Sequence, residues 1–305
     1  MSLTVVGSIA FDAVKTPFGE RERMLGGAAT HFALAASFFD EIRVVGPVGD
    51  DFGDDAYAVL RTRGTNTDDV EHVAGGKSFF WAGEYGWDLN SRETLDTQLG
   101  VFETFEPKLS DASRGAETLF LANIQPDLQR QVREQCEAAK FVALDSMNLW
   151  IEIARDSLVK TIEGVDCLIL NDAELRQLTQ KPNLVGAARE ILGWGPTAIV
   201  AKQGEYGAAL ITPDELFALP AYPLETVVDP TGAGDTFAGG FVGFLSRHPG
   251  EYRRAMAYGT ALASFNVEEF GTDRVARLTA EEITERVSEL QRITHFEDAP
   301  IELRA

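Results

Sequence analysis

The sequence has little cysteine, no run of basic residues and no long apolar segment. Its two cysteines, Cys136 and Cys167, have a spacing that fits neither a metal site nor a disulfide framework, so we expect both to be reduced core residues. No apolar run approaches membrane-spanning length, and the chain does not open with the pattern of a signal peptide. These features predict a cytoplasmic protein without a membrane partner.

The charge balance is strongly acidic, with a formal net charge of −21. A nucleic acid partner needs a basic surface, which this composition does not provide, so we expect none. Any phosphate site must therefore be built locally. Neither linkers rich in proline or serine nor internal repeats divide the chain, so residues 1–305 are predicted to form a single domain.

Short β-branched segments alternate with helical patterns along most of the chain. The predicted strands are 3–9, 43–49, 118–123, 141–147, 167–171 and 198–202. Segments between them, such as 28–39 and 126–139, have the spacing of helices. This alternation predicts an α/β fold in which helices cover both faces of a mostly parallel central sheet.

Several predicted strands end on, or are closely followed by, a polar residue: Asp12, Asn123, Asp145, Asn171 and Lys202. In open α/β sheets, ligands bind beyond the carboxyl ends of the strands, so these residues are candidates for a site. An Asp or Asn at such a turn is also a common helix cap. Capping is the main role that we expect for Asn123 and Asp145.

Residues 77–107 break the alternation. Phe79, Trp81, Tyr85 and Trp87 fall on one side at period two, which predicts a small antiparallel insertion with an aromatic face. That face either packs on its own domain or on a second subunit, or it covers a bound substrate. A homodimer through this insertion is one outcome of the first alternative.

The most informative stretch is VVDPTGAGDTFAGGFVGFL, residues 227–245. A glycine-rich turn that leads into a helix points several unpaired N–H groups at one spot, and the helix dipole adds to them. Gly232, Ala233 and Gly234 are therefore predicted to form an anion hole. A carboxylate beside the hole is well placed to take a proton from an attacking hydroxyl, which makes Asp235 a candidate general base. The alternative is an ordinary turn with Asp235 as its N-cap.

This stretch resembles the C-terminal signature of the ribokinase-like carbohydrate kinases, the PfkB family. Four further elements resemble the family in its order: VVGSIAFD with LGGAATHFALAAS, then VGPVGDDFG, NDAEL and VAKQGEYGA. The resemblance implies a ribokinase-like three-layer α/β/α sandwich with a small β lid insertion, part of which lies within residues 77–107. It also implies an ATP-dependent kinase that uses Mg²⁺ and phosphorylates a hydroxymethyl hydroxyl of a sugar.

The resemblance assigns the phosphoryl-transfer roles to the glycine-rich stretch. Asp235 would deprotonate the acceptor hydroxyl, and the backbone of Gly232, Ala233 and Gly234 would hold the charge that develops on the transferred group. Asp229, Thr231 and the loop around Gly271 match the region where some relatives hold a monovalent cation. Activation by K⁺ is therefore an open expectation.

The resemblance also predicts the nucleotide side of the site. Asn171 and Glu174 would organise Mg²⁺ and the phosphates, with Glu174 acting on the ion through water. Read alone, Glu174 is an exposed first-turn acid favoured by the helix dipole. Further positions would border the nucleotide: Lys202, Gly204, Gly207, Thr260 and Ser264. The first three also read as a turn between two strands, and the last two as packing residues of a helix.

On the acceptor side, Asp12 stands where the family acid contacts sugar hydroxyls, and Gly26 and Gly27 lie where the backbone passes close to the sugar. Two positions depart from the pattern. Ala10 replaces an asparagine of ribokinase, and His31 replaces the usual asparagine after the paired glycines. We therefore do not expect ribose to be the acceptor. His31 either hydrogen-bonds the substrate or packs on its helix beside Phe32.

Other functions remain open at this point. Trp81, Tyr85 and Trp87 would allow stacking on a nucleobase, and the chain would then be a nucleoside kinase of the same family. A non-catalytic relative that senses a sugar or nucleotide would have lost Asp235 or the glycines, and both are present. A Rossmann dehydrogenase is disfavoured because GSIAFD, not a glycine-rich loop, follows the first strand. The tail after His295 has no functional account.

Overall fold

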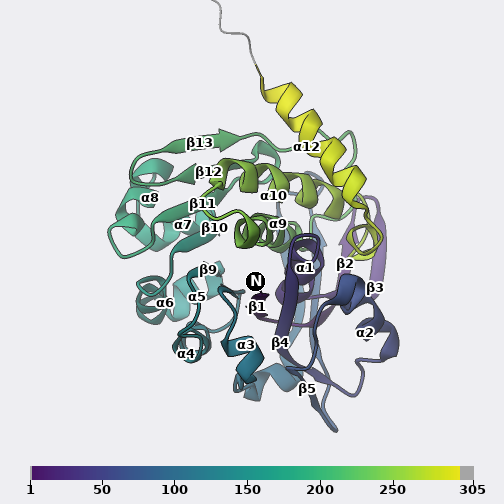
Figure 1. The fold of residues 1–305 in the computed structure, drawn as a ribbon. Coiled ribbons are helices and arrows are strands. Elements are labelled where there is room, and N and C mark those ends of the chain that lie inside the picture. Colours follow the sequence, from purple (N-terminus) through teal and green to yellow (C-terminus); the bar gives the residue numbers. More distant parts are fainter. Residues whose placement is uncertain (1, 296–305) are drawn as a thin grey trace, which may run out of the picture.

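The structure is a computed structural model that describes residues 2–295, so the tail after His295 lies outside the described residues. Its centre is a nine-stranded sheet (Figure 1). In spatial order the strands are β13 (Leu216–Leu219), β12 (Ala208–Ile211), β11 (Ala198–Lys202), β10 (Cys167–Asn171), β9 (Phe141–Asp145), β8 (Thr118–Leu121), β1 (Ser2–Val6), β4 (Glu41–Gly49) and β5 (Val70–Val73). Neighbours are parallel from β5 to β11, and β12 and β13 run antiparallel.

Central strands of this sheet are apolar on both faces because helices cover both. In β8, Phe120 points into the core on one side, while Leu119 and Leu121 point into the core on the other. Strands buried in this way read as continuous apolar runs without polar alternation. Cys167 and Cys136 are buried in the two cores without a disulfide, which confirms the prediction that they are reduced core residues.

Helices form the outer layers of the fold. One face of the sheet carries α1 (Ala28–Ala36), α2 (Asp54–Leu60), α9 (Ala233–Arg247) and α10 (Tyr252–Asn266). The other carries α4 (Pro126–Gln135), α5 (Asn148–Ile153), α6 (Arg155–Ile162), α7 (Asp172–Thr179) and α8 (Leu184–Leu192). Short α3 (Asp111–Arg114) and α11 (Asp273–Ala276) and the C-terminal α12 (Ala280–Thr294) complete the helices. Figure 1 shows α1, α9 and α10 grouped together, as expected for the predicted three-layer α/β/α architecture.

A second, four-stranded sheet corresponds to the predicted lid. Its strands, in spatial order, are β3 (Gly19–Gly26), β2 (Ala10–Thr16), β6 (Phe79–Tyr85) and β7 (Arg92–Gln98). Strands β2 and β3 of this sheet were not predicted. Asp12 was expected just after the first strand, but it lies inside β2. The antiparallel insertion expected within residues 77–107 is confirmed by the pairing of β6 with β7, and β6 joins the rest of the lid sheet through a parallel pairing with β2. Residues 77–107 contribute only β6 and β7 to the lid.

The aromatic stripe of the lid divides among different surroundings. Phe79 packs on Phe102 of its own domain, with ring centroids 6.1 Å apart. Trp87 follows β6 and is 90% exposed, so the predicted stripe does not extend to it. The edge strands β3 and β7 carry mostly exposed charged or polar side chains, and a dimer through the lid stays a prediction.

In the described part of the chain, no helix combines the length and the apolar character that crossing a membrane requires.

Glycines allow α1 and α9 to pack closely over the site. A Cβ atom on Gly239 would lie 2.3 Å from the carbonyl oxygen of Phe32 and 2.8 Å from the Cβ of Ala35. Backbone of α1 occupies that space, so no side-chain rotation can relieve the contact. This close approach holds the N-terminal end of α9 against the end of the sheet where the candidate residues lie.

We predict that Gly239→Ala lowers the free energy of unfolding by about 1–3 kcal/mol or more, because the two helices must separate. Gly186→Ala in α8 is the matched control. A Cβ there makes its nearest contact at 3.6 Å, so the same replacement should gain up to about 1 kcal/mol from helix propensity. Denaturant unfolding of both variants checks this, and equal effects would contradict the proposed packing role.

Candidate active site

Polar residues at the ends of three neighbouring strands meet the N-terminus of α9. Asp145 ends β9, Asn171 ends β10 and Lys202 ends β11, and Asn171 and Lys202 are direct partners across the parallel pair. Carboxyl ends of parallel strands share one edge of the sheet, which explains why sequence-distant residues gather there.

The glycine turn, residues 229–234, leads into α9. Its Gly232 has φ 73°, in the left-handed region that favours glycine. The N–H of Thr231 donates to Asp229 Oδ1 (2.9 Å) and that of Ala233 donates to the Pro230 carbonyl (3.2 Å). Within the described residues, the N–H groups of Gly232 and Gly234 have no such partner. Two of the three predicted donors are therefore free to bind an anion.

Asp229 ties the glycine turn to the loop at Gly271. Its carboxylate is fully buried and accepts hydrogen bonds from the N–H of Thr231 through Oδ1 and of Gly271 through Oδ2 (3.0 Å). The structure thus brings together the three positions predicted to surround a monovalent cation. Because both carboxylate oxygens already hold the loops, the observed role of Asp229 is to fix the turn, and a cation there stays a prediction.

Lys202 lies against the glycine turn and pairs with Asp145. Its Nζ is 3.0 Å from Asp145 Oδ2, and a Cβ atom on Gly234 would lie 3.0 Å from the same Nζ. Burial by itself lowers the pKa of Lys202, but the charges of Asp145, Glu174 and Asp235 outweigh it and raise the pKa. The ammonium therefore stays protonated beside the glycine turn.

Asp235 occupies the first turn of α9, at the place predicted for a general base. Its pKa is raised to about 7, chiefly by burial and also by the charge of Asp145, while the charge of Lys202 opposes both. A carboxyl with this pKa is partly ionised at neutral pH and accepts a proton readily, which suits a base.

Asp145 is a site residue that the sequence analysis assigned to capping. Its side chain is 4% exposed and pairs with Lys202, while α5 starts only at Asn148 after the N-cap Met147. Asn123 is not a cap either, because α4 begins at Pro126 and the Asn123 Oδ1 accepts from Trp150 Nε1 (3.0 Å). The polar end of a strand was the correct signal for Asp145.

Asn171 and Glu174 form a capping box at the start of α7. Asn171 Oδ1 accepts from the N–H of Glu174 (2.7 Å), and Glu174 Oε2 accepts from the N–H of Asn171 (2.8 Å). Glu174 is 8% exposed, so the reading as an exposed acid is wrong. Burial raises its pKa to about 7, although Lys202 opposes the shift.

The described residues contain no cluster of three or more His, Cys, Asp or Glu side chains that would hold a metal ion. This donor set fits Mg²⁺ only in the predicted indirect form, in which phosphate oxygens and water supply most ligands. Glu174 retains carboxylate lone pairs for such water, since among the described residues its side chain accepts only the bond from the Asn171 N–H.

Asp12 reaches the site from β2 in the lid sheet. It is 5% exposed, and its pKa is raised to about 7, chiefly by burial and also by the charges of Asp229 and Asp235. A Cβ atom on Gly26 would lie 1.9 Å from Asp12 Oδ2, and one on Gly27 would lie 2.5 Å from the Ser8 carbonyl. A side chain at Gly26 would therefore collide with the Asp12 carboxylate, and one at Gly27 would collide with the backbone of Ser8, so both positions require glycine.

His31 lies beneath the glycine turn and not on an open surface. It is 2% exposed, and its Nδ1 is 3.1 Å from Asn266 Oδ1. The ring is buried on α1, which agrees with the packing alternative, and it lies against Gly232, while a substrate contact stays a prediction.

A cavity of about 630 Å³ opens beside Lys202 and the start of α9. Its lining includes these predicted residues: Lys202, Gly204, Gly207, Ala233, Gly234, Thr260 and Ser264. The sequence analysis missed the apolar wall of Tyr222, Leu224, Val227 and Val267. Asn171 and Glu174 are not among the lining residues.

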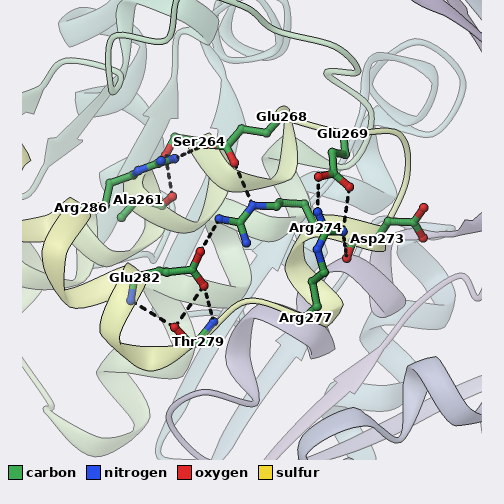
Figure 2. Close-up of polar contacts among 10 residues, drawn as sticks. All are labelled: Ala261, Ser264, Glu268, Glu269, Asp273, Arg274, Arg277, Thr279, Glu282 and Arg286. Carbon is green, nitrogen blue, oxygen red and sulfur yellow. Dashed lines mark hydrogen bonds and ion pairs between the residues drawn. The ribbon is translucent and has the colours of Figure 1, made fainter.

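The Ser264 hydroxyl at this wall is already engaged by protein groups. It donates to the Ala261 carbonyl (2.7 Å) and accepts from Arg286 Nη1 (3.1 Å). Figure 2 shows Arg286 of α12 reaching Ser264, with Glu268 also close by. The guanidinium also lies 4.4 Å from the ring centroid of Tyr222. These contacts favour the reading of Ser264 as a packing residue that shapes the cavity.

The lid contacts both the glycine turn and the loop at Gly204. The Thr231 hydroxyl donates to the Tyr85 hydroxyl (3.2 Å), and Asn90 Nδ2 donates to Glu205 Oε1 (3.0 Å). Asp88, Leu89 and Asn90 also line the cavity. The β6–β7 hairpin therefore spans from the glycine turn to the loop at Gly204.

Comparisons with known proteins agree with this geometry. Residues 2–277 match the sequence model of the pfkB family carbohydrate kinases. The chain is 28% identical to a cytidine kinase of Thermococcus kodakarensis over 81% of this chain and 89% of that protein. It is also 28% identical to a deoxyribokinase of Salmonella typhi over 81% of this chain and 82% of the relative.

The fold is shared with a solved nucleoside kinase of Burkholderia thailandensis in complex with inosine. The TM-score is 0.79 at 21% identity, covering 94% of this chain and 97% of the other. A ribokinase of Cryptococcus neoformans var. grubii in complex with ADP has a TM-score of 0.76 at 19% identity, over 93% and 99% of the two chains. With its mostly parallel sheet, its β lid and its match over most of its length, the chain belongs to the pfkB family and is a kinase of ribokinase-like fold.

Proposed function

We propose that the chain transfers the γ-phosphoryl group of ATP to the hydroxymethyl oxygen of a sugar. One observation supports this above the others. Asp235, with its pKa raised to about 7, stands at the N-terminus of α9 beside two free backbone N–H groups and the Lys202 ammonium. A base, an anion hole and a fixed cation at one place are the parts that phosphoryl transfer requires.

In this proposal the Asp235 carboxylate takes the proton of the acceptor hydroxyl. The hydroxyl oxygen forms a bond to the γ-phosphorus as the bond from that phosphorus to the ADP oxygen breaks. The N–H groups of Gly232 and Gly234 and the ammonium of Lys202 stabilise the negative charge that spreads over the transferred group. Asp235 then releases the proton to solvent, which restores the base.

The cavity beside Lys202 is proposed as the nucleotide site. Its apolar wall suits a base, and its Gly204 and Gly207 end suits phosphates. When bound, Mg²⁺ would neutralise phosphate charge, and Glu174 and Asn171 would orient its waters. K⁺ near Asp229 is a separate prediction that the assay below addresses.

A nucleoside is the second candidate acceptor. Two observations favour it: relatives include a cytidine kinase, and β6 of the lid carries both Trp81 and Tyr85, whose hydroxyl contacts Thr231 of the glycine turn. Against it, Trp87 points to solvent and an Arg92 guanidinium already lies 5.2 Å from the centroid of the Trp81 ring. Base stacking in the lid would have to displace this cation. A free sugar needs no such rearrangement.

A coupled ADP-release assay with Mg²⁺ and ATP tests the function over free pentoses, hexoses, keto-sugar acids and ribonucleosides, each with and without K⁺. We expect turnover on a free sugar other than ribose. Turnover confined to nucleosides would replace the sugar by the second candidate. No turnover across the panel would contradict the kinase proposal and favour a sensor.

We predict that Asp235→Asn lowers kcat by about 10²–10⁴-fold, because the base is lost while size and packing are kept. Affinity for ATP, measured by titration calorimetry, should stay close to that of the unchanged protein. Removing a buried carboxylate whose folded pKa is above its unfolded value should also raise the melting temperature at pH 8. Turnover near the original rate would remove Asp235 as the base.

The pKa of about 7 predicts an acid limb in kcat/KM. Below pH 7 the Asp235 carboxyl is protonated and cannot accept the acceptor proton, so kcat/KM should be about tenfold lower at pH 6 than at pH 8. Asp12 has a pKa in the same range, so Asp12→Asn is the control. This variant should keep the acid limb, and its loss would assign the limb to Asp12.

A further inference from the structure

Three buried side chains from three helices meet under the glycine turn. Thr236 of α9 donates to Asn266 Oδ1 (2.9 Å), and His31 of α1 places its Nδ1 3.1 Å from the same oxygen. Asn266, at the end of α10, donates through Nδ2 to the carbonyl of Thr231 inside the turn (2.7 Å). His31 is 2% exposed, and Thr236 and Asn266 are fully buried. Buried polar groups without water are held rigidly when their bonds are satisfied.

The donor pattern fixes the ring of His31. Asn266 uses its amide nitrogen on a carbonyl, so its oxygen is the acceptor facing His31. The proton of the neutral ring is then on Nδ1. Burial lowers the pKa of His31, which keeps the ring neutral. Nε2 is buried and has no hydrogen-bond partner among the described residues, so one bond of the ring to Asn266 sets its orientation.

The face of this ring supports Gly232. A Cβ atom on Gly232 would lie 2.4 Å from three atoms of the ring, Nδ1, Cε1 and Nε2. The ring therefore lies directly below the residue whose left-handed φ sets the direction of the free N–H groups. From the other side, Asn266 holds the carbonyl of Thr231. The turn is thus fixed on both sides of Gly232.

We propose that His31 is a positioning residue that, with Asn266, clamps the glycine turn so that the N–H groups of Gly232 and Gly234 stay aligned for phosphoryl transfer. This inference rests on the proposed function and assigns His31 a role other than the predicted substrate contact. Misplacing catalytic donors by about 1 Å costs as much as 10²-fold in rate, so a ring remote from the reacting atoms can control turnover.

The test is His31→Phe, which keeps a ring under Gly232 and removes the hydrogen bond to Asn266. We expect kcat to fall about 10–100-fold while KM for ATP and for the acceptor change less than about threefold. Amide hydrogen exchange of the peptide over residues 229–236 should become faster. The control is Phe32→Leu, the next residue on α1, whose ring stacks on Phe120 away from the turn. It should lower the melting temperature and leave kcat and the exchange of this peptide unchanged.

Other outcomes overturn the clamp. A higher KM for the acceptor with unchanged exchange would make His31 a substrate contact. An unchanged kcat in a folded variant would leave it a packing residue. If His31→Phe does not fold, Thr236→Val removes one donor to Asn266 at nearly constant shape, and faster exchange with lower kcat is again expected.

Exchange separates this inference from the proposed function. If the unchanged protein phosphorylates no acceptor, the proposed function fails, and the peptide over residues 229–236 still reports on the clamp. Faster exchange in His31→Phe would then support it, and unchanged exchange would refute it.

Discussion

The positive charge of Lys202 compensates the buried carboxylates of the candidate site. It lies between the carboxylate of Asp145 and the glycine turn, and its charge is the largest single influence that lowers the pKa of Asp235 and of Glu174. Without it, several buried carboxylates would face one another uncompensated, which is far more costly than losing a surface ion pair. In the proposed function, the same ammonium provides an attractive charge for phosphate in a protein whose net charge is −21.

The buried carboxyl groups around Lys202 have raised pKa values. Asp12, Glu174 and Asp235 each have a pKa near 7, with burial as the largest cause. The folded chain holds these protons more tightly than the unfolded chain, so their contribution to stability is present below about pH 4 and is lost as pH rises toward 7. At neutral pH these groups therefore lower the stability of the fold, but they can accept protons. Because they are partly protonated, the site also carries less negative charge than its number of carboxyl groups suggests.

Parts of the site that depend on local sequence were predictable. The GAGD stretch predicted a glycine-rich turn that leads into a helix because glycine and helix dipole act within a few residues. Strands buried on both faces were equally clear from their apolar runs. The charged hairpin strand β3 has exposed side chains and no alternating pattern, so its sequence did not indicate a strand.

Tertiary partners were not predictable from the same signals. Asp145 and Lys202 lie on β9 and β11, with β10 between them, and no local pattern distinguishes such a pair from a helix cap. The position of His31 follows from the crossing of α1, α9 and α10, which brings Asn266 from 235 residues away. A sequence motif places His31 near the acceptor, whereas packing places its ring under the turn.

The lid contacts two separate parts of the candidate site, the glycine turn and the loop at Gly204. Tyr85, at the end of β6, meets Thr231 of the glycine turn, and Asn90, in the loop before β7, meets Glu205 beside the cavity. Both contacts lie on one hairpin, so a movement that breaks one also strains the other. Asp12 lies on β2, the direct neighbour of β6 in the lid sheet. Displacement of the lid would therefore move Asp12 and disturb the contacts at Thr231 and Glu205 together, so in the proposed function this small sheet couples the acceptor side of the site to the nucleotide side.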